Sequence, residues 1–318
     1  MKNFAFVFPG QGSQAIGMLD GFAGNPVVAD TVAEANESLG IDLGKLMAEG
    51  PKDELNLTTN TQPVMLTASV AVYRAWIAAG GPVPKVVAGH SVGEYAALVA
   101  AGVIAFKDAV PLVRFRAQVM QEAVPVGQGG MAVILGLQAD HVRAACREAA
   151  AELPGSVVEA VNFNEPTQIV IAGHTAAVER AGELAKAKGA KRAMTLPVSA
   201  PFHSSLLQPA SDRLRDYMAE LTFSAPQIAL INNVDVAILN DPAAIKDALV
   251  RQAAGPVRWV ETMQQIVGGG AELVVECAPS KALVGMAKRI FPGLLSEPLL
   301  DQGSLERVLS MLNGAEAA

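Results

Sequence analysis

Cysteine, aromatic residues and charged residues are all scarce in this sequence. Its 318 residues include two cysteines, 5% aromatic residues and 17% charged residues. Cys146 and Cys277 stand in no recognisable motif, and two scattered cysteines indicate a reducing compartment, so we expect a cytoplasmic protein. A hydrophobic fraction of 51%, supplied by small aliphatic residues more than by aromatic ones, fits closely packed layers of helices and sheets.

Long hydrophobic runs, positive charge and metal-ligand clusters are also missing. The first apolar run, Phe4 to Phe8, stops at Pro9-Gly10 and is too short for a signal-peptide core or a membrane span. A net charge of −7 argues against a nucleic-acid partner. Histidines, cysteines and carboxylates do not gather at ligand spacing, so we expect no metal site. The sequence predicts a soluble globular protein that binds neither membrane nor nucleic acid.

The most informative stretch that is present is Gly89-His90-Ser91-Val92-Gly93-Glu94. The apolar run Val86 to Ala88 precedes it, and an alanine-rich helical pattern follows from Tyr95. A strand, a tight turn and a helix form the context that exposes a serine as a nucleophile at the top of a sheet. The glycines allow backbone angles that a Cβ would obstruct, and the helix N-terminus offers free amides. The alternative is a glycine-rich turn with an idle serine, but the flanking elements favour a nucleophile.

The order of elements predicts two domains. Before Pro125, strands and helices alternate, which indicates a parallel sheet covered on both faces. After Pro125 the order becomes β-α-β-β-α-β, the ferredoxin-like unit. We expect its strands at 131–135, 157–163, 168–172 and 192–198, and its helices at 139–152 and 176–188. We therefore predict an α/β fold with a large domain from residues 1–126 and 200–318, and an inserted ferredoxin-like small domain from residues 127–199.

A serine hydroxyl needs a neighbouring base, and four histidines are available. His141 and His174 fall in the insert, where we expect surface positions. His90 adjoins Ser91, where side chains of adjacent residues diverge. His203 lies where the insert returns to the large domain, and domain junctions favour clefts. His203 is therefore the favoured base, with an ordinary loop histidine as the alternative.

No third, acidic member of a triad is evident. In α/β hydrolases the acid lies between serine and histidine in chain order. Most of that interval is the predicted insert, and no acidic residue clearly caps a strand of the main sheet. We expect a group other than a carboxylate to orient His203, which argues against an ordinary esterase.

Several separate motifs in a fixed order carry a resemblance to a known family. They are Phe8–Gln14, Thr61–Pro63, Gly89–Glu94, Arg116, Met120–Pro125, Asn162, Pro201–Ser204, Val250–Gln252 and Pro256–Trp259. On these residues the chain resembles, nearly end to end, the malonyl-CoA:acyl carrier protein transacylases of fatty-acid synthesis and the acyltransferase domains of polyketide synthases. The resemblance implies a hydrolase-like parallel-sheet core with a ferredoxin-like insert, in agreement with the partition above.

The resemblance also implies catalytic roles. Ser91 matches the nucleophile and His203 the general base. Gln252 matches the residue whose backbone carbonyl holds the imidazole in its working tautomer. The backbone amides of Gln11 and Val92 match the oxyanion hole.

Arg116 matches the clamp that holds a substrate carboxylate. A guanidinium can bind a malonyl carboxylate through two parallel hydrogen bonds, which would favour malonyl over acetyl. Arg114 stands two positions earlier in the same helical run, and we expect it to be a solvated surface residue.

Further positions bear on the substrate. Val92 after the serine and Phe202 before the histidine are of the type found in malonyl-selective relatives, where bulk near the α-carbon excludes a branching methyl group. Met120 and Asn162 belong to the matched motifs, and the resemblance implies that they also bind the substrate. Because one methyl group changes binding only modestly, the preference over methylmalonyl is expected to be strong and not absolute.

The implied reaction moves a malonyl group from malonyl-CoA to acyl carrier protein through a malonyl-serine ester. Coenzyme A is then a substrate, no cofactor is expected, and the enzyme is expected to be a monomer. An acidic carrier protein would dock on a basic patch, either Lys281, Lys288 and Arg289 or the cluster at 186–192. Either cluster is otherwise a solvated face.

Rival interpretations remain open at this stage. One is a serine thioesterase or esterase, and another is an acyl-CoA-binding scaffold with an inert site. A third is a sister transacylase that serves a polyketide or malonate-decarboxylase carrier protein. The sequence has no short motif that selects among the carrier proteins.

Overall fold

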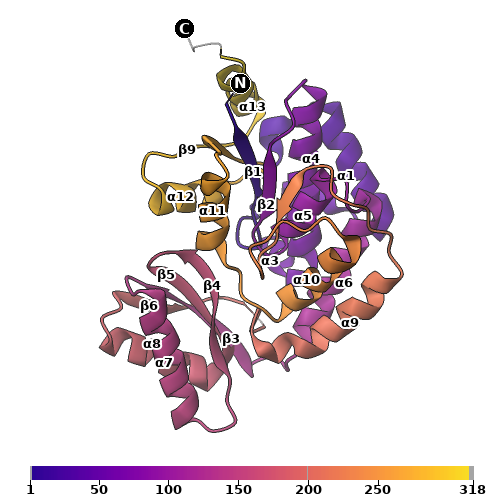
Figure 1. Cartoon of the computed structure of the whole chain (residues 1–318). Coiled ribbons are helices and arrows are strands. Elements are labelled where there is room, and N and C mark those ends of the chain that lie inside the picture. Colours follow the sequence, from indigo (N-terminus) through magenta and orange to yellow (C-terminus); the bar gives the residue numbers. More distant parts are fainter. Residues whose placement is uncertain (1, 199, 315–318) are drawn as a thin grey trace.

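The computed structural model describes residues 2–198 and 200–314, which form two β-sheets with associated helices (Figure 1). The predicted end of the small domain at residue 199, and the chain ends at residues 1 and 318, lie outside the described residues. Within the described part, no helix combines the length and the apolar character needed to cross a membrane.

The larger sheet is parallel, and the described strands follow the order β7-β2-β1-β8-β9. The strands are β1 (Phe4–Phe8), β2 (Val86–Gly89), β7 (Ala229–Ile231), β8 (Leu273–Glu276) and β9 (Leu295–Pro298). Phe8 pairs with Gly89 in the register of β1 and β2. The carboxyl ends of these two strands therefore meet at one edge of the sheet, which is where α/β folds place ligands.

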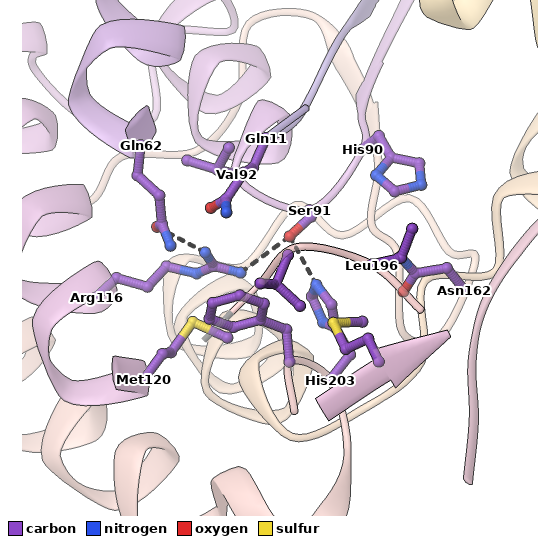
Figure 2. A pocket seen from close by; sticks show the side chains of 13 residues that line it. Gln11, Gln62, His90, Ser91, Val92, Arg116, Met120, Asn162, Leu196 and His203 are labelled. Atoms are coloured by element: carbon purple, nitrogen blue, oxygen red, sulfur yellow. Dashed lines mark hydrogen bonds between the residues drawn. The ribbon is translucent and has the colours of Figure 1, made fainter. Parts of the chain in front are cut away.

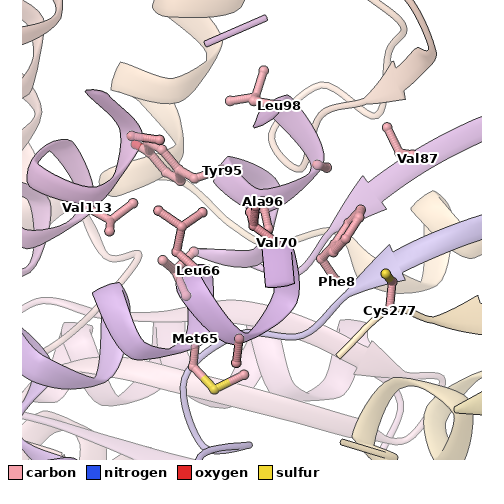
Figure 3. Close-up of a cluster of buried hydrophobic side chains, with 14 of the residues drawn as sticks. Phe8, Met65, Leu66, Val70, Val87, Tyr95, Ala96, Leu98, Val113 and Cys277 are labelled. Carbon is pink, nitrogen blue, oxygen red and sulfur yellow. The ribbon is translucent and has the colours of Figure 1, made fainter. Parts of the chain in front are cut away.

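Side chains of β1 alternate between the two faces of this sheet, as period-2 strand geometry requires. Phe4, Phe6 and Phe8 face one layer, and Ala5 and Val7 face the other. The scarce aromatic residues concentrate on the first face, where the rings of β1 contact Tyr73 and Trp76. Figure 3 shows Phe8 and Val87 in this core, which includes Leu66 and Tyr95.

Most helices contribute buried residues to the hydrophobic core on the face of the sheet that carries Phe4, Phe6 and Phe8. These are α1 (Pro26–Leu39), α2 (Leu43–Glu49), α3 (Lys52–Asn56), α4 (Thr58–Ala78), α5 (Gly93–Ala100), α6 (Phe106–Glu122), α9 (Gln208–Ala219), α10 (Pro242–Ala253) and α13 (Gln302–Asn313), with short 3₁₀ turns at Asp20–Phe22 and Ser205–Leu207. The opposite face packs on α11 (Trp259–Gly268) and α12 (Ala282–Ile290). Both faces are thus buried, which explains the near-continuous apolar strands.

The smaller sheet is antiparallel, with the order β4-β5-β3-β6. Its elements are β3 (Gly129–Leu135), α7 (Ala139–Glu152), β4 (Val158–Glu165), β5 (Gln168–His174), α8 (Thr175–Ala187) and β6 (Arg192–Thr195). Helices α7 and α8 lie on one face of this sheet (Figure 1). They share an apolar cluster with that face. The predicted fold class, a parallel-sheet core with a βαββαβ insert, is confirmed.

The small sheet is fastened to the rest of the chain through β4. The backbone nitrogen of Phe163 donates to the carbonyl of Val257 at 2.9 Å, and the nitrogen of Val257 donates to the carbonyl of Val161 at 2.8 Å. Arg289 on α12 pairs with the buried Glu165 at 2.6 Å. These contacts fix the position of the small sheet beside the carboxyl edge of the large one.

Candidate active site

Ser91 lies in a tight turn between β2 and α5. Its backbone has φ of 55°, a left-handed conformation that is costly for a residue with a Cβ. A Cβ on Gly93 would stand 2.1 Å from the carbonyl oxygen of Phe8, and one on Gly89 would stand 1.9 Å from the carbonyl carbon of Gly93. The turn therefore requires glycine at both positions, as the motif predicted.

Asn233, which follows β7, braces the turn from behind. Its side-chain oxygen accepts a hydrogen bond from the backbone nitrogen of Ser91 at 2.8 Å, and its Nδ2 donates to the carbonyl of Gly89 at 2.6 Å. Asn233 is completely buried. Two buried hydrogen bonds to one turn help to hold the strained conformation that exposes the serine hydroxyl.

His203 meets this hydroxyl. The distance between Ser91 Oγ and His203 Nε2 is 2.7 Å (Figure 2). His203 Nδ1 lies 2.9 Å from the carbonyl oxygen of Gln252 and 3.2 Å from that of Gly255. Carbonyls only accept, so the proton stays on Nδ1 and leaves Nε2 free to accept the serine proton.

The imidazole of His203 is held in its neutral form. The pKa of His203 is lowered from 6.5 to about 3, mainly by burial and also by the positive charge of Arg116, against the two carbonyl contacts that raise it. A general base must be unprotonated to act, and this one meets that requirement at neutral pH.

Arg116 on α6 reaches the same hydroxyl from the other side (Figure 2). Its side chain is 1% exposed, and one terminal nitrogen donates to Ser91 Oγ at 3.2 Å and to Gln252 Oε1 at 2.9 Å. The other terminal nitrogen donates to Gln62 Oε1 at 2.7 Å. Within the described residues these acceptors are all uncharged, so a buried cation faces the nucleophile without a directly bonded anion. Such a site favours an anionic ligand.

The surrounding cavity has a volume of about 110 Å³ and lies between the two sheets. Its lining comprises Gln11, Gln62, His90, Ser91, Val92, Arg116, Met120, Met131, Asn162, Leu196, Val198, Phe202 and His203. The predicted residues Gln11, Val92, Met120, Asn162 and Phe202 thus share one cavity with the serine, the histidine and the arginine. Gln252 contacts His203 and Arg116 but does not line the cavity.

The remaining sequence candidates lie elsewhere. Lys281, Lys288 and Arg289 are exposed on or beside α12, and none of them lines the cavity. Arg114, expected to be a solvated surface residue, is instead half-buried, because its guanidinium donates to Asn60 at 2.7 Å. Within residues 2–198 and 200–314, histidines, cysteines and carboxylates form no group of three or more that could hold a metal ion.

Comparison with known proteins assigns the chain to a family. The family model described as an acyl transferase domain matches residues 5–292. This chain belongs to the acyl transferase domain family. The resemblance seen in the sequence motifs is therefore confirmed.

Individual relatives of this acyl transferase match over nearly the whole chain. A malonyl CoA-acyl carrier protein transacylase of Salmonella typhimurium is 52% identical over 311 residues, which are 98% of this chain and 100% of the relative. The crystal structure of an acyl-carrier-protein S-malonyltransferase from Burkholderia pseudomallei is 64% identical, with a TM-score of 0.95 over 97% of this chain and 99% of that one. A malonyl-transacylase solved in complex with its type II PKS acyl-carrier protein is 49% identical, with a TM-score of 0.95 over 97% and 99%.

Sequence reasoning missed several residues of this acyl transferase site. Gln62 stands in a matched motif that predicts no role for it, and Asn233 belongs to none of the matched motifs. The side chain of His90 also lines the cavity, where its Nε2 lies 2.7 Å from Asn164 Oδ1. His174, expected at the surface, is half-buried and accepts a hydrogen bond from the backbone of Val157. The signal that the sequence offers for Asn233 is its place just after the short apolar segment that forms β7.

Proposed function

We propose that this acyl transferase moves the malonyl group of malonyl-CoA to the phosphopantetheine thiol of acyl carrier protein, for fatty-acid biosynthesis. The observation that carries the proposal is the buried Arg116 guanidinium 3.2 Å from Ser91 Oγ. A malonyl thioester carries a free carboxylate two carbons from the carbonyl under attack, and Arg116 is placed to hold it. The activity named in the relatives supports the same substrate.

In the first half-reaction, His203 Nε2 takes the proton of Ser91 as Oγ attacks the thioester carbonyl. The backbone amides of Gln11 and Val92 stabilise the oxyanion, and such a donor contributes about 2.7–4 kcal/mol in the transition state. The C–S bond breaks, and the imidazolium returns its proton to the departing coenzyme A thiol. Ser91 is left as a malonyl ester.

In the second half-reaction the pantetheine thiol of the carrier protein gives its proton to His203 and attacks the ester. The C–O bond to Ser91 breaks, and the serine recovers its proton from the imidazolium. Parallel initial-rate plots are expected because coenzyme A leaves before the carrier protein reacts. Coenzyme A is accordingly a substrate and not a cofactor. We also infer a monomer that works in the cytoplasm.

Two apolar residues support selection by size. Val92 is 1% exposed and Phe202 is 8% exposed, and both line the cavity beside Ser91. Bulk at these positions leaves little room for a methyl branch on the α-carbon of the acyl group. Because one methyl group changes binding by about 1–3 kcal/mol, methylmalonyl should be disfavoured and not wholly excluded.

Intact-mass and peptide mass spectrometry after incubation with malonyl-CoA tests this function. We expect one malonyl group per chain, located on Ser91, that persists until reduced acyl carrier protein is added and then appears on the carrier. Rapid loss of the adduct to water without a carrier would instead support a thioesterase. No adduct at all would support a binding protein with an inert serine.

We propose that the carrier protein docks on the exposed Lys281 and Lys288, with Arg289 at the edge of the patch. Arg289 is already paired with Glu165, so the two lysines are the better targets. Charge reversal with Lys281→Glu and Lys288→Glu should raise the KM for carrier protein several-fold and leave malonylation of Ser91 by malonyl-CoA unchanged.

The matched control is charge reversal at Lys186 and Lys191, two exposed lysines of the small domain. If the control raises the KM and the first pair does not, the docking surface lies on the small domain. If neither pair changes the KM, basic docking on these surfaces is wrong.

A further inference from the structure

Glu94 is a buried carboxylate at the first turn of α5, and the reaction steps above give it no task. Its side chain is 2% exposed and does not line the cavity. Burying a carboxylate is costly unless it is well bonded. The hydrogen-bond partners of Glu94 therefore indicate its role in the structure.

Both partners of Glu94 belong to the catalytic surroundings. Glu94 Oε2 accepts a hydrogen bond from Gln252 Nε2 at 2.8 Å and another from the backbone nitrogen of Asn233 at 3.0 Å. Asn233 is the residue that braces the turn of Ser91. One carboxylate oxygen thus joins the nucleophile turn to Gln252.

Gln252 in turn contacts two residues of the proposed site, Arg116 and His203. Its Oε1 accepts from Arg116 at 2.9 Å, while its Nε2 also donates to the carbonyl of Ser91 at 3.1 Å. Its backbone carbonyl accepts from His203 Nδ1. The side chain of Gln252 therefore bonds to Arg116, and its main chain bonds to His203.

The direction of the Gln252 amide is the critical point. An amide has a donor end and an acceptor end of nearly equal shape, so it can turn over when its neighbours permit. Turned over, it would present N–H groups to the Arg116 guanidinium, which has only donors. An ionised carboxylate and a carbonyl both accept and cannot donate, so Glu94, together with the carbonyl of Ser91, keeps Nε2 on its own side and Oε1 on the side of Arg116.

We propose that Glu94 is a positioning residue that fixes the Gln252 amide toward Arg116 and so sets the preference of Ser91 for a carboxylate-bearing acyl group. This inference rests on the proposed malonyl transfer. Its effect should be confined to anionic acyl groups, because the backbone carbonyl that orients His203 does not depend on the direction of the side-chain amide.

Protonation of Glu94 should remove this control. The pKa of Glu94 is raised to about 7, mainly by burial and to a smaller extent by the charge of Asp235, against the hydrogen bonds from Gln252 and Asn233 and the attraction of Arg116. Tyr95, the other titratable neighbour, has its pKa raised to about 12 and stays neutral. A protonated Glu94 can donate to a reversed amide. The malonyl preference should therefore fall as pH drops through 7, where neutral His203 does not titrate.

The test compares rates of Ser91 acylation by malonyl-CoA and acetyl-CoA, followed by coenzyme A release in single turnover between about pH 5.5 and pH 8.5. For Glu94→Gln we expect about a 10-fold lower ratio of malonyl to acetyl rates at pH 8, the size of one charge-assisted hydrogen bond. The ratio should no longer change with pH. Glu94→Asp keeps an acceptor-only group and should retain part of the ratio and its pH dependence.

Glu276→Gln is the matched control, because Glu276 is a buried carboxylate on β8 that accepts from the backbone of Val284, away from the cavity. It should leave the ratio unchanged. An unchanged or higher ratio in Glu94→Gln, or equal losses with both substrates, would overturn the inference while the proposed function stands. Wild-type protein without any malonyl preference would overturn both. If Glu94→Gln does not fold, a wild-type ratio that stays constant across pH 7 overturns the inference alone.

Discussion

Replacing Ser91 with alanine is expected to abolish formation of the malonyl-enzyme and to reduce transfer by roughly 10⁴- to 10⁶-fold. The hydroxyl is the only atom group removed, and it is the one that bonds to His203 at 2.7 Å. Alanine has the same Cβ as serine, so the left-handed backbone at this position gains no new strain. The loss should therefore be chemical and not structural, with an unchanged thermal midpoint.

Mass spectrometry and steady-state transfer measure this loss together, with His203→Ala as the companion variant. His203→Ala should be equally slow, because a nucleophile and its base act as one unit and their losses do not add. In the wild type, the low pKa of His203, about 3, predicts that activity does not fall through protonation of this residue near its ordinary value of 6.5. A malonyl adduct of normal yield on Ser91→Ala protein would show that another group is the nucleophile.

Replacing Arg116 with alanine is expected to remove the preference for malonyl over acetyl. Charge-assisted hydrogen bonds contribute about 1.5–3 kcal/mol each, so malonyl transfer should fall by about 10- to 100-fold more than acetyl transfer. The guanidinium lies within hydrogen-bond distance of the serine oxygen, close enough for a malonyl carboxylate to meet it. The relevant measurement is kcat/KM for the two CoA thioesters.

Arg114→Ala is the matched control. Arg114 lies on the same helix two positions away and bonds to Asn60 outside the cavity. It should leave the ratio of malonyl to acetyl rates unchanged. Equal losses for both substrates in Arg116→Ala would mean that this residue supports the site without holding the carboxylate.

Local patterns in the sequence were sufficient for the fold class and for the order of elements in the small sheet. The alternation of Phe4, Phe6 and Phe8 with small residues reports a strand buried on both faces, since strand periodicity is a short-range property. The glycines on either side of Ser91 predicted the turn, because the backbone segments approach too closely there for a Cβ. The order of elements after Pro125 predicted the βαββαβ unit, and no strand boundary differs from the prediction by more than three residues.

The sequence predicted only part of the candidate site. His203 was favoured by elimination, and the structure brings it to Ser91 while His141 stays exposed on α7. The resemblance predicts that Arg116 is a carboxylate clamp, but no local pattern shows that this residue is buried. It also offered no reason to group Gln62, Asn233 and Glu94.

The sequence by itself determined the strands, the helices and the nucleophile turn, because these depend on side-chain periodicity and backbone freedom within a few residues. Only the tertiary structure decided which distant polar groups share a buried site. Glu94 and Gln252 are 158 positions apart and contact one another at 2.8 Å. Parallel strands bring their carboxyl ends to one edge regardless of their separation along the chain, and the hydrogen bonds formed there leave no periodic trace in the sequence.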